Sequence, residues 1–372
     1  MKTAYLVLED GTVFEGISFG ADGEVEGEVV FNTSMTGYQE ILTDPSYYGQ
    51  MVCMTYPLIG NYGVNEEDFE SDKPYVSAFI VKEYSKTYSN YRATSSLGDF
   101  LKKYDIIGIE GVDTRKLVKH IRERGSMNAI ISTETDDIDY LKEKAKNIPS
   151  IVGKDLVQFV TTKKTYEWTE GSWILGKGFY KPEKFDLHIV AIDFGIKRNI
   201  LRYFVDNGCK VTVVPANSKF EDIENLNPDG IFLSNGPGDP EPIKYGIELA
   251  QKAIEKYPVF GICLGNQILS LALGGKTYKL KFGHHGGNQP VMDLETKKVE
   301  ITAQNHCFAV DIDSLSDVVE VTHINLNDKT VEGVRHKTKP VFAVQYHPEN
   351  GPGPHDAIYL FRRFVDLIRS CK

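Results

Sequence analysis

A cysteine between two glycines is the first feature of this sequence that could do chemistry. Cys263 lies in the run Gly261-Ile262-Cys263-Leu264-Gly265, between a short apolar strand pattern at 259–262 and a helical pattern at 266–273. A strand-to-helix turn of this form exposes its central side chain above a sheet. The positive end of the helix favours a thiolate, so Cys263 is a candidate nucleophile. The alternative is a small buried side chain in a glycine-flanked turn.

A base and a carboxylate follow a second apolar run near the end of the chain. His347 and Glu349 come directly after the strand pattern at 341–346. Alternate residues of extended backbone point to the same side. His347 can therefore face the turn that holds Cys263, while Glu349 fixes the tautomer of the ring. The alternative is a surface histidine beside a proline.

A loop rich in glycine and proline follows a third strand pattern, at 230–233. Its sequence is Ser234-Asn235-Gly236-Pro237-Gly238-Asp239-Pro240. Open α/β sheets bind ligands at the carboxyl ends of their strands, where this loop is expected. The backbone N–H groups of the loop and of Leu264 are candidate donors to an oxyanion. Taken alone, the loop could equally be a tight turn.

Together, and in the chain order of loop, cysteine turn and His-Pro-Glu, the three segments resemble the class I (triad) glutamine amidotransferases. The marks of that family are a GPG loop, a GxCxGxQ elbow and an HPE near the C-terminus. All three are present, as Gly236-Pro237-Gly238, Gly261 to Gln267, and His347-Pro348-Glu349. The resemblance implies that a Cys263, His347 and Glu349 triad hydrolyses glutamine.

The N-terminal half carries a second resemblance. Several of its segments are similar to the N-terminal domain of carbamoyl phosphate synthase small subunits: Phe31 to Glu40, Thr43 to Tyr47, Tyr56 to Asn61, and Gly111 to Arg115. This resemblance implies a large synthetase subunit as partner, which binds ATP, Mg and bicarbonate and receives the ammonia. The carbamoyl phosphate it makes would serve arginine and pyrimidine synthesis. The small subunit itself is expected to need no cofactor.

The resemblance also implies a set of glutamine-binding positions. One of them departs from the family pattern, because Cys307 stands where the family usually has glycine. If the backbone there requires a positive φ, the larger residue costs about 1 kcal/mol. The full set is Ser46, Gly236, Gly238, Leu264, Gln267, Asn305, Cys307 and Phe308.

Two other functions remain open from the sequence. One is a free-standing γ-glutamyl hydrolase or cysteine peptidase of the same fold, and the other is a binding subunit without catalytic activity. The large N-terminal domain argues against a solitary hydrolase, which needs no docking module. The complete Cys, His and Glu set argues against an inactive subunit.

Length and composition limit the class of protein. The chain has 372 residues, and domains of about 100–200 residues suggest two or three of them. A net charge of -10 without a basic stripe argues against nucleic acid as a partner. No apolar run is long enough to span a membrane. Five scattered cysteines without a CxxC pair indicate a reducing cytoplasm rather than a disulfide framework or a zinc ribbon.

The strand and helix patterns divide the chain into three parts. Residues 1–150 are predicted to form an α+β, β-rich domain with a helix that begins after Asp113 and ends at Gly125. Residues 151–186 are a predicted connector. Residues 187–372 alternate strand and helix, which predicts an α/β fold with a mostly parallel sheet covered by helices.

Two further motifs predict no site. The segment Ser270 to Thr277 approaches a phosphate-binding loop but has serine in place of the first glycine. His284 and His285 are neighbours on a predicted strand and point to opposite faces, so one ion could not easily bind both. We therefore expect neither a nucleotide nor a metal in this chain.

Overall fold

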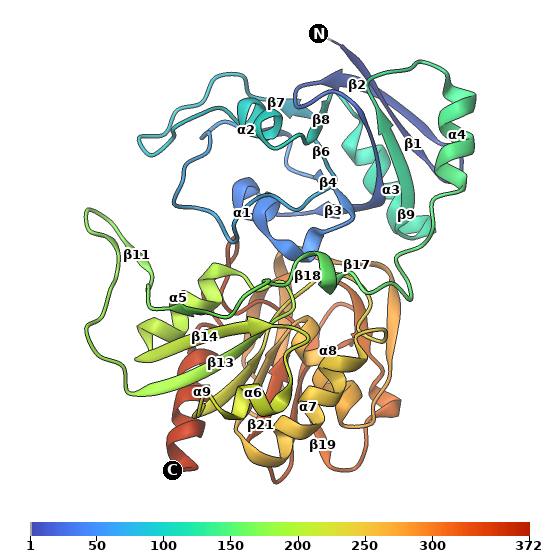
Figure 1. The fold of residues 1–372 in the computed structure, drawn as a ribbon. Coiled ribbons are helices and arrows are strands. Elements are labelled where there is room, and N and C mark those ends of the chain that lie inside the picture. The colour runs from blue at the N-terminus through green and yellow to red at the C-terminus, as the bar shows by residue number, and fades with distance from the viewer. Residues whose placement is uncertain (1) are drawn as a thin grey trace. The chain divides into compact units, whose positions relative to one another are not determined.

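The computed structural model describes residues 2–372 and divides into two compact units. The first contains the chain up to Val152 together with Lys281–Gly286, and the second contains Gly153–Leu280 and Gly287–Lys372 (Figure 1). Within residues 2–372, no helix combines the length and the apolar character that crossing a bilayer requires.

The first unit is built on a closed β-barrel. Its strand order is β1-β2-β8-β6-β4-β3-β9, and β1 closes the barrel because it pairs with both β2 and β9. Apolar side chains such as Leu6, Val29 and Ile131 fill its interior. The strands are β1 (Thr3–Leu8), β2 (Val13–Ser18), β3 (Glu24–Asn32), β4 (Gln50–Met54), β6 (Ala78–Ile80), β8 (Ile107–Glu110) and β9 (Met127–Ser132).

Short helices and one small sheet complete this unit. The predicted helix after Asp113 is confirmed as α3, where the Asp113 side chain accepts from the backbone N–H of Lys116 at the N-terminus and Gly125 ends the helix with φ 109°. The elements are α1 (Tyr38–Thr43), η1 (Pro45–Tyr47), β5 (Leu58–Ile59), β7 (Glu83–Tyr84), α2 (Leu97–Lys103), α3 (Thr114–Arg124) and α4 (Ile138–Lys146).

The second unit is built on a large mixed sheet of order β10-β14-β13-β15-β16-β21-β20-β19-β17-β18. The run from β14 to β21 is parallel throughout. Because parallel strands share one direction, the residues that follow β15, β16 and β21 come to the same edge of the sheet. The strands are β10 (Tyr166–Trp168), β13 (Leu187–Asp193), β14 (Cys209–Pro215), β15 (Gly230–Leu233), β16 (Val259–Ile262), β17 (Thr277–Asp293), β18 (Val299–Val310), β19 (Val319–Asn325), β20 (Val331–His336) and β21 (Val341–Val344).

Helices cover both faces of the parallel strands. Successive residues of β13 enter different cores: Val190 and Ile192 pack with residues of α7 and α8, whereas Ile189 and Ala191 pack with residues of α5 and α9. A strand buried on both faces is typical of a parallel sheet, so the predicted α/β fold is confirmed. The helices are α5 (Arg198–Asp206), α6 (Phe220–Glu224), α7 (Lys244–Lys256), α8 (Leu264–Ala272) and α9 (Tyr359–Ser370).

The segment predicted as a connector contains regular structure. Its β10 pairs antiparallel with β14, so it extends the sheet of the second unit. It also contains the hairpin of β11 (Trp173–Ile174) and β12 (Gly178–Phe179). Two 3-10 turns, η2 (Val157–Phe159) and η3 (Ile312–Ser314), complete this unit. Residues 153–186 therefore group with the second unit.

Candidate active site

Cys263 occupies a sharp turn between β16 and α8. Its backbone has φ 55° and ψ -106°, a conformation that residues other than glycine rarely adopt. The turn leaves no room beside it: a Cβ on Gly265 would lie 2.1 Å from the carbonyl oxygen of Leu233, and one on Gly261 would lie 2.8 Å from the backbone of Gly265. The two glycines therefore allow the bend that presents the cysteine.

His347 and Glu349 form a buried pair just beyond β21. The Nδ1 of His347 lies 2.6 Å from Oε1 of Glu349, and the two side chains are 3% and 0% exposed. The backbone N–H of His347 donates to the carbonyl of Ala303 at 2.8 Å, which fixes the residue against β18. Since the carboxylate accepts from Nδ1–H, Nε2 is left for a second partner.

Adjacent strands bring the cysteine to this pair. β16 and β21 are parallel neighbours, with Ile262 opposite Val344, and the N–H of Cys263 donates to the carbonyl of Val344 at 2.9 Å. The Cys263 thiol lies close enough to influence the protonation of His347. Its Sγ donates to the carbonyl of Asn305 at 3.6 Å, and Nε2 of His347 has no partner at hydrogen-bonding geometry among residues 2–372. Hydrogen bonds between catalytic groups of this kind tighten when substrate binds.

Lys197 adds a cation that the sequence reasoning missed. Its Nζ lies 3.0 Å from Oε1 of Glu349, and the side chain is 3% exposed. Nζ also donates to the carbonyl of Asn350. The only sequence signal is its position shortly after the carboxyl end of β13, in the run Asp193 to Lys197. Its contact with Glu349, which is far along the chain, exists only in the folded protein.

Burial and charge set the protonation of the pair in opposite directions. Burial raises the pKa of Glu349, but the charges of Lys197 and His347 outweigh burial and hold that pKa well below its ordinary value. Burial lowers the pKa of His347, but Glu349 and Cys263 outweigh it and raise that pKa well above 6.5. The arrangement therefore favours an imidazolium at His347, which can protonate a leaving group.

The predicted oxyanion donors lie on the loop after β15 and at the start of α8. A Cβ on Gly236 would lie 2.2 Å from the carbonyl oxygen of Phe194, so only glycine fits there. Gly238 has φ 81°. Among the described residues, neither the N–H of Gly236 nor that of Leu264 donates to a backbone carbonyl. Both are available to a developing negative charge.

The remaining predicted glutamine-binding residues of the second unit lie on α8 and β18. Gln267 is 2% exposed, and its Nε2 donates to the carbonyl of Phe308 at 2.8 Å. Asn305 supplies the carbonyl that accepts from the Cys263 thiol. Cys307 lies within β18 and is not among the described residues with positive φ. Replacing the family's glycine therefore imposes no left-handed strain on the backbone.

Ser46 belongs to the first unit. It lies in η1, is 6% exposed, and its N–H donates to Oδ1 of Asp44 at 2.9 Å. Its contact with glutamine stays a prediction.

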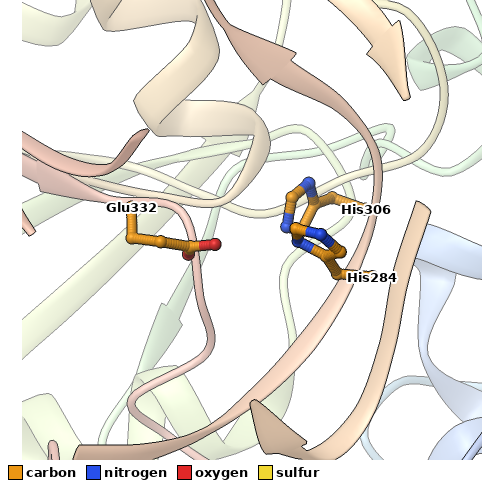
Figure 2. Close-up of side chains that lie close together, drawn as sticks. All are labelled: His284, His306 and Glu332. Atoms are coloured by element: carbon orange, nitrogen blue, oxygen red, sulfur yellow. The ribbon is translucent and has the colours of Figure 1, made fainter. Parts of the chain in front are cut away.

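Two buried side chains of the second unit have the chemistry of metal ligands. Figure 2 shows the Glu332 carboxylate turned toward the ring of His306, and their ligand atoms lie within 4.8 Å. Both ring nitrogens of His306 already face oxygens, with Nδ1 2.7 Å from the carbonyl of Phe308 and Nε2 3.0 Å from Oε1 of Gln304. A structural metal usually needs four ligands, so two from this unit assign no metal. His284, also labelled there, lies in the part of β17 that groups with the first unit.

Comparison with known proteins assigns both halves of the chain. Residues 6–131 match the family described as "Carbamoyl-phosphate synthase small chain, CPSase domain", and residues 190–367 match "Glutamine amidotransferase class-I". The carbamoyl phosphate synthase small chain of Syntrophotalea carbinolica is 60% identical over 99% of this chain and 98% of its own. The carbamoyl phosphate synthase small chain of Aquifex aeolicus is 59% identical, and the match covers 99% of this chain and 100% of the Aquifex aeolicus chain. A solved glutamine amidotransferase from Thermotoga maritima is 18% identical, with a TM-score of 0.37, over 50% of this chain and 85% of its own.

Proposed function

The chain belongs to the carbamoyl phosphate synthase small chain family, and on that premise we propose that Cys263, His347 and Glu349 hydrolyse glutamine to glutamate and ammonia. One observation carries the assignment of the site. A cysteine held at positive φ on a strand-to-helix turn lies beside a buried His and Glu pair that follows the adjacent parallel strand.

Acylation follows from the protonation of the site. The Cys263 thiolate attacks the side-chain amide carbon of glutamine, forming a C–S bond and a tetrahedral oxyanion. The N–H groups of Gly236 and Leu264 stabilise that oxyanion. As the C–N bond breaks, the His347 imidazolium gives its proton to the nitrogen, and ammonia leaves.

Deacylation uses the same ring in its neutral form. In the γ-glutamyl thioester the sulfur no longer carries a charge, which removes one of the interactions that raise the pKa of His347. Having lost its proton to ammonia, His347 can take one from the attacking water. Glu349 keeps the ring aligned, and Lys197 keeps Glu349 ionised. Glutamate leaves and the thiol is restored.

The ammonia is the product that matters to the whole enzyme. Near pH 7 free ammonia is mostly protonated and is no nucleophile, so an enclosed path to a synthetase preserves its reactivity. We propose that the large subunit receives it in a heterodimer and makes carbamoyl phosphate there from bicarbonate and ATP, with Mg bound to that subunit. The small chain requires no metal or organic cofactor for these steps. Its cysteines are all free thiols, which fits a cytoplasmic location.

The direct test is the Cys263→Ser variant in the complex reconstituted with the large subunit. We expect glutamine-dependent carbamoyl phosphate formation to disappear while synthesis from added ammonia continues. The Cys371→Ser variant is the control, because this thiol is exposed and outside the site. Retained use of glutamine by Cys263→Ser would refute the site. Strong peptidase turnover by the isolated chain would instead indicate a free-standing hydrolase.

A further inference from the structure

We propose that Gln345 is a positioning residue that orients the side-chain amide of Gln267 toward the α-amino group of the substrate. This inference rests on the proposed function, since it concerns how the same site holds glutamine. Gln345 lies between β21 and His347 and is 0% exposed. Its side chain contacts the side-chain amides of Asn266 and Gln267, and these contacts identify the oxygen and the nitrogen of each amide.

The orientation of Gln267 is set at its contact with β18. The terminal atom 2.8 Å from the carbonyl oxygen of Phe308 must be a donor, because a carbonyl can only accept. That atom is therefore Nε2. The same nitrogen lies 3.1 Å from the side chain of Gln345. Both of its hydrogens are thus used within the protein.

The orientation of Gln345 follows from that of Gln267. Only an oxygen can accept from Nε2 of Gln267, so the near atom of Gln345 is Oε1. The same oxygen accepts from Nδ2 of Asn266 at 3.2 Å. Turning the Gln345 amide over would place its NH₂ group against the NH₂ group of Gln267, which cannot accept a hydrogen bond. One carbonyl therefore holds two consecutive side chains of α8.

Backbone contacts keep this carbonyl in place. The N–H of Gln345 donates to the carbonyl of Glu332 on β20 at 2.9 Å. His347, two residues further on, is fixed to Ala303 through its own N–H. The residue that orients Gln267 and the catalytic base therefore lie on one short segment that is held on both sides.

The hydrogen bonds of Gln267 decide which of its side-chain atoms can contact a substrate. With both Nε2 hydrogens used within the protein, only Oε1 of Gln267 can contact a ligand. A carbonyl oxygen suits the α-ammonium group of an amino acid. Without Gln345 the amide of Gln267 would lose one of its two anchors and could rotate, which weakens binding more than chemistry.

The experiment compares Gln345→Met, which keeps the size but removes the acceptor, with Gln345→Glu, which keeps an acceptor oxygen. Both are measured in the complex with the large subunit, with glutamine and with ammonia. For Gln345→Met we expect the KM for glutamine to rise about tenfold, with kcat and ammonia-dependent synthesis within about threefold of wild type. Gln345→Glu should keep KM within about threefold. Gln251→Met, on the exposed side of α7, is the matched control.

A double-mutant cycle separates positioning from general loosening of the site. If Gln345 acts through Gln267, then Gln345→Met should change KM less than about twofold in a Gln267→Met background. An undiminished effect in that background, or an unchanged KM in the single variant, overturns the inference. If Gln345→Met does not fold, Gln345→Asn replaces it, because it withdraws the carbonyl by one methylene. Failure of the proposed function is distinct, since wild-type complex would then not use glutamine at all.

Discussion

Replacing Gly236 by alanine should disable glutamine hydrolysis while leaving the chain folded. The added Cβ would lie 2.2 Å from the carbonyl oxygen of Phe194 and 2.7 Å from Cδ2 of Leu264. A carbon and an oxygen need more than about 3 Å, so the backbone at Gly236 must move by on the order of 1 Å. The Phe194 carbonyl cannot easily shift away, because the backbone N–H of Phe194 donates a hydrogen bond to Oγ of Ser234 at 2.9 Å.

That displacement removes the Gly236 N–H from the oxyanion. Loss of one oxyanion donor costs about 100- to 1000-fold in kcat, and a misplacement of about 1 Å can cost about 100-fold. We therefore expect kcat for glutamate release to fall about 100-fold or more. The assay measures glutamate release by the reconstituted complex, with ammonia-dependent synthesis as the internal reference and thermal unfolding as the check on folding.

A matched variant separates the clash from the cost of alanine itself. Gly274 has φ 89°, and a Cβ added there would meet no atom within 4 Å, so Gly274→Ala carries only the conformational cost of about 1 kcal/mol. It should lower the free energy of unfolding slightly and leave kcat unchanged. If Gly236→Ala retains kcat within about threefold of wild type, the assignment of this loop to the oxyanion is wrong.

Three further outcomes follow from pKa, packing and helix capping. Because the pKa of His347 is raised above 6.5, the ring should keep its proton, and kcat/KM for glutamine should not fall as pH rises through 6.5. The Glu349→Gln variant removes a charge that raises this pKa, so the fall of kcat/KM at alkaline pH should move to lower pH. Phe204→Ala leaves a cavity at a side chain that is 0% exposed and should lower the free energy of unfolding, measured in urea, by about 3–5 kcal/mol. A loss of less than about 1 kcal/mol would contradict the tight packing of this side chain. Asp113→Ala removes the acceptor for the N–H of Lys116 and should cost about 1 kcal/mol by the same measurement.

The elements that hold the reacting groups could be predicted because their signals are local. The glycines around Cys263, the apolar run before His347 and the proline-rich loop each lie within a few residues of the group they position. The capped helix after Asp113 is equally local. Short-range turn and capping chemistry is what a single sequence carries most directly.

The parts that escaped prediction depend on contacts between distant residues. Closure of the barrel needs β1 beside β9, with Tyr5 opposite Ser132. Lys197 acquires its role only when β13 brings it to Glu349. Gln345 lies only two residues before His347, but its partners Asn266 and Gln267 come from α8, which is distant in the sequence. The segment 151–186 has weak apolar rhythm, so its local pattern does not reveal the edge strand β10, which forms by pairing with β14.

The most direct test of the mechanism is to trap the covalent intermediate. The reconstituted complex is quenched in acid during steady-state turnover of glutamine, digested, and analysed by mass spectrometry. A γ-glutamyl thioester found on Cys263, and absent when ammonia replaces glutamine, is the predicted result. An active complex that carries the acyl group on Cys307 or on any residue other than Cys263 would contradict the account.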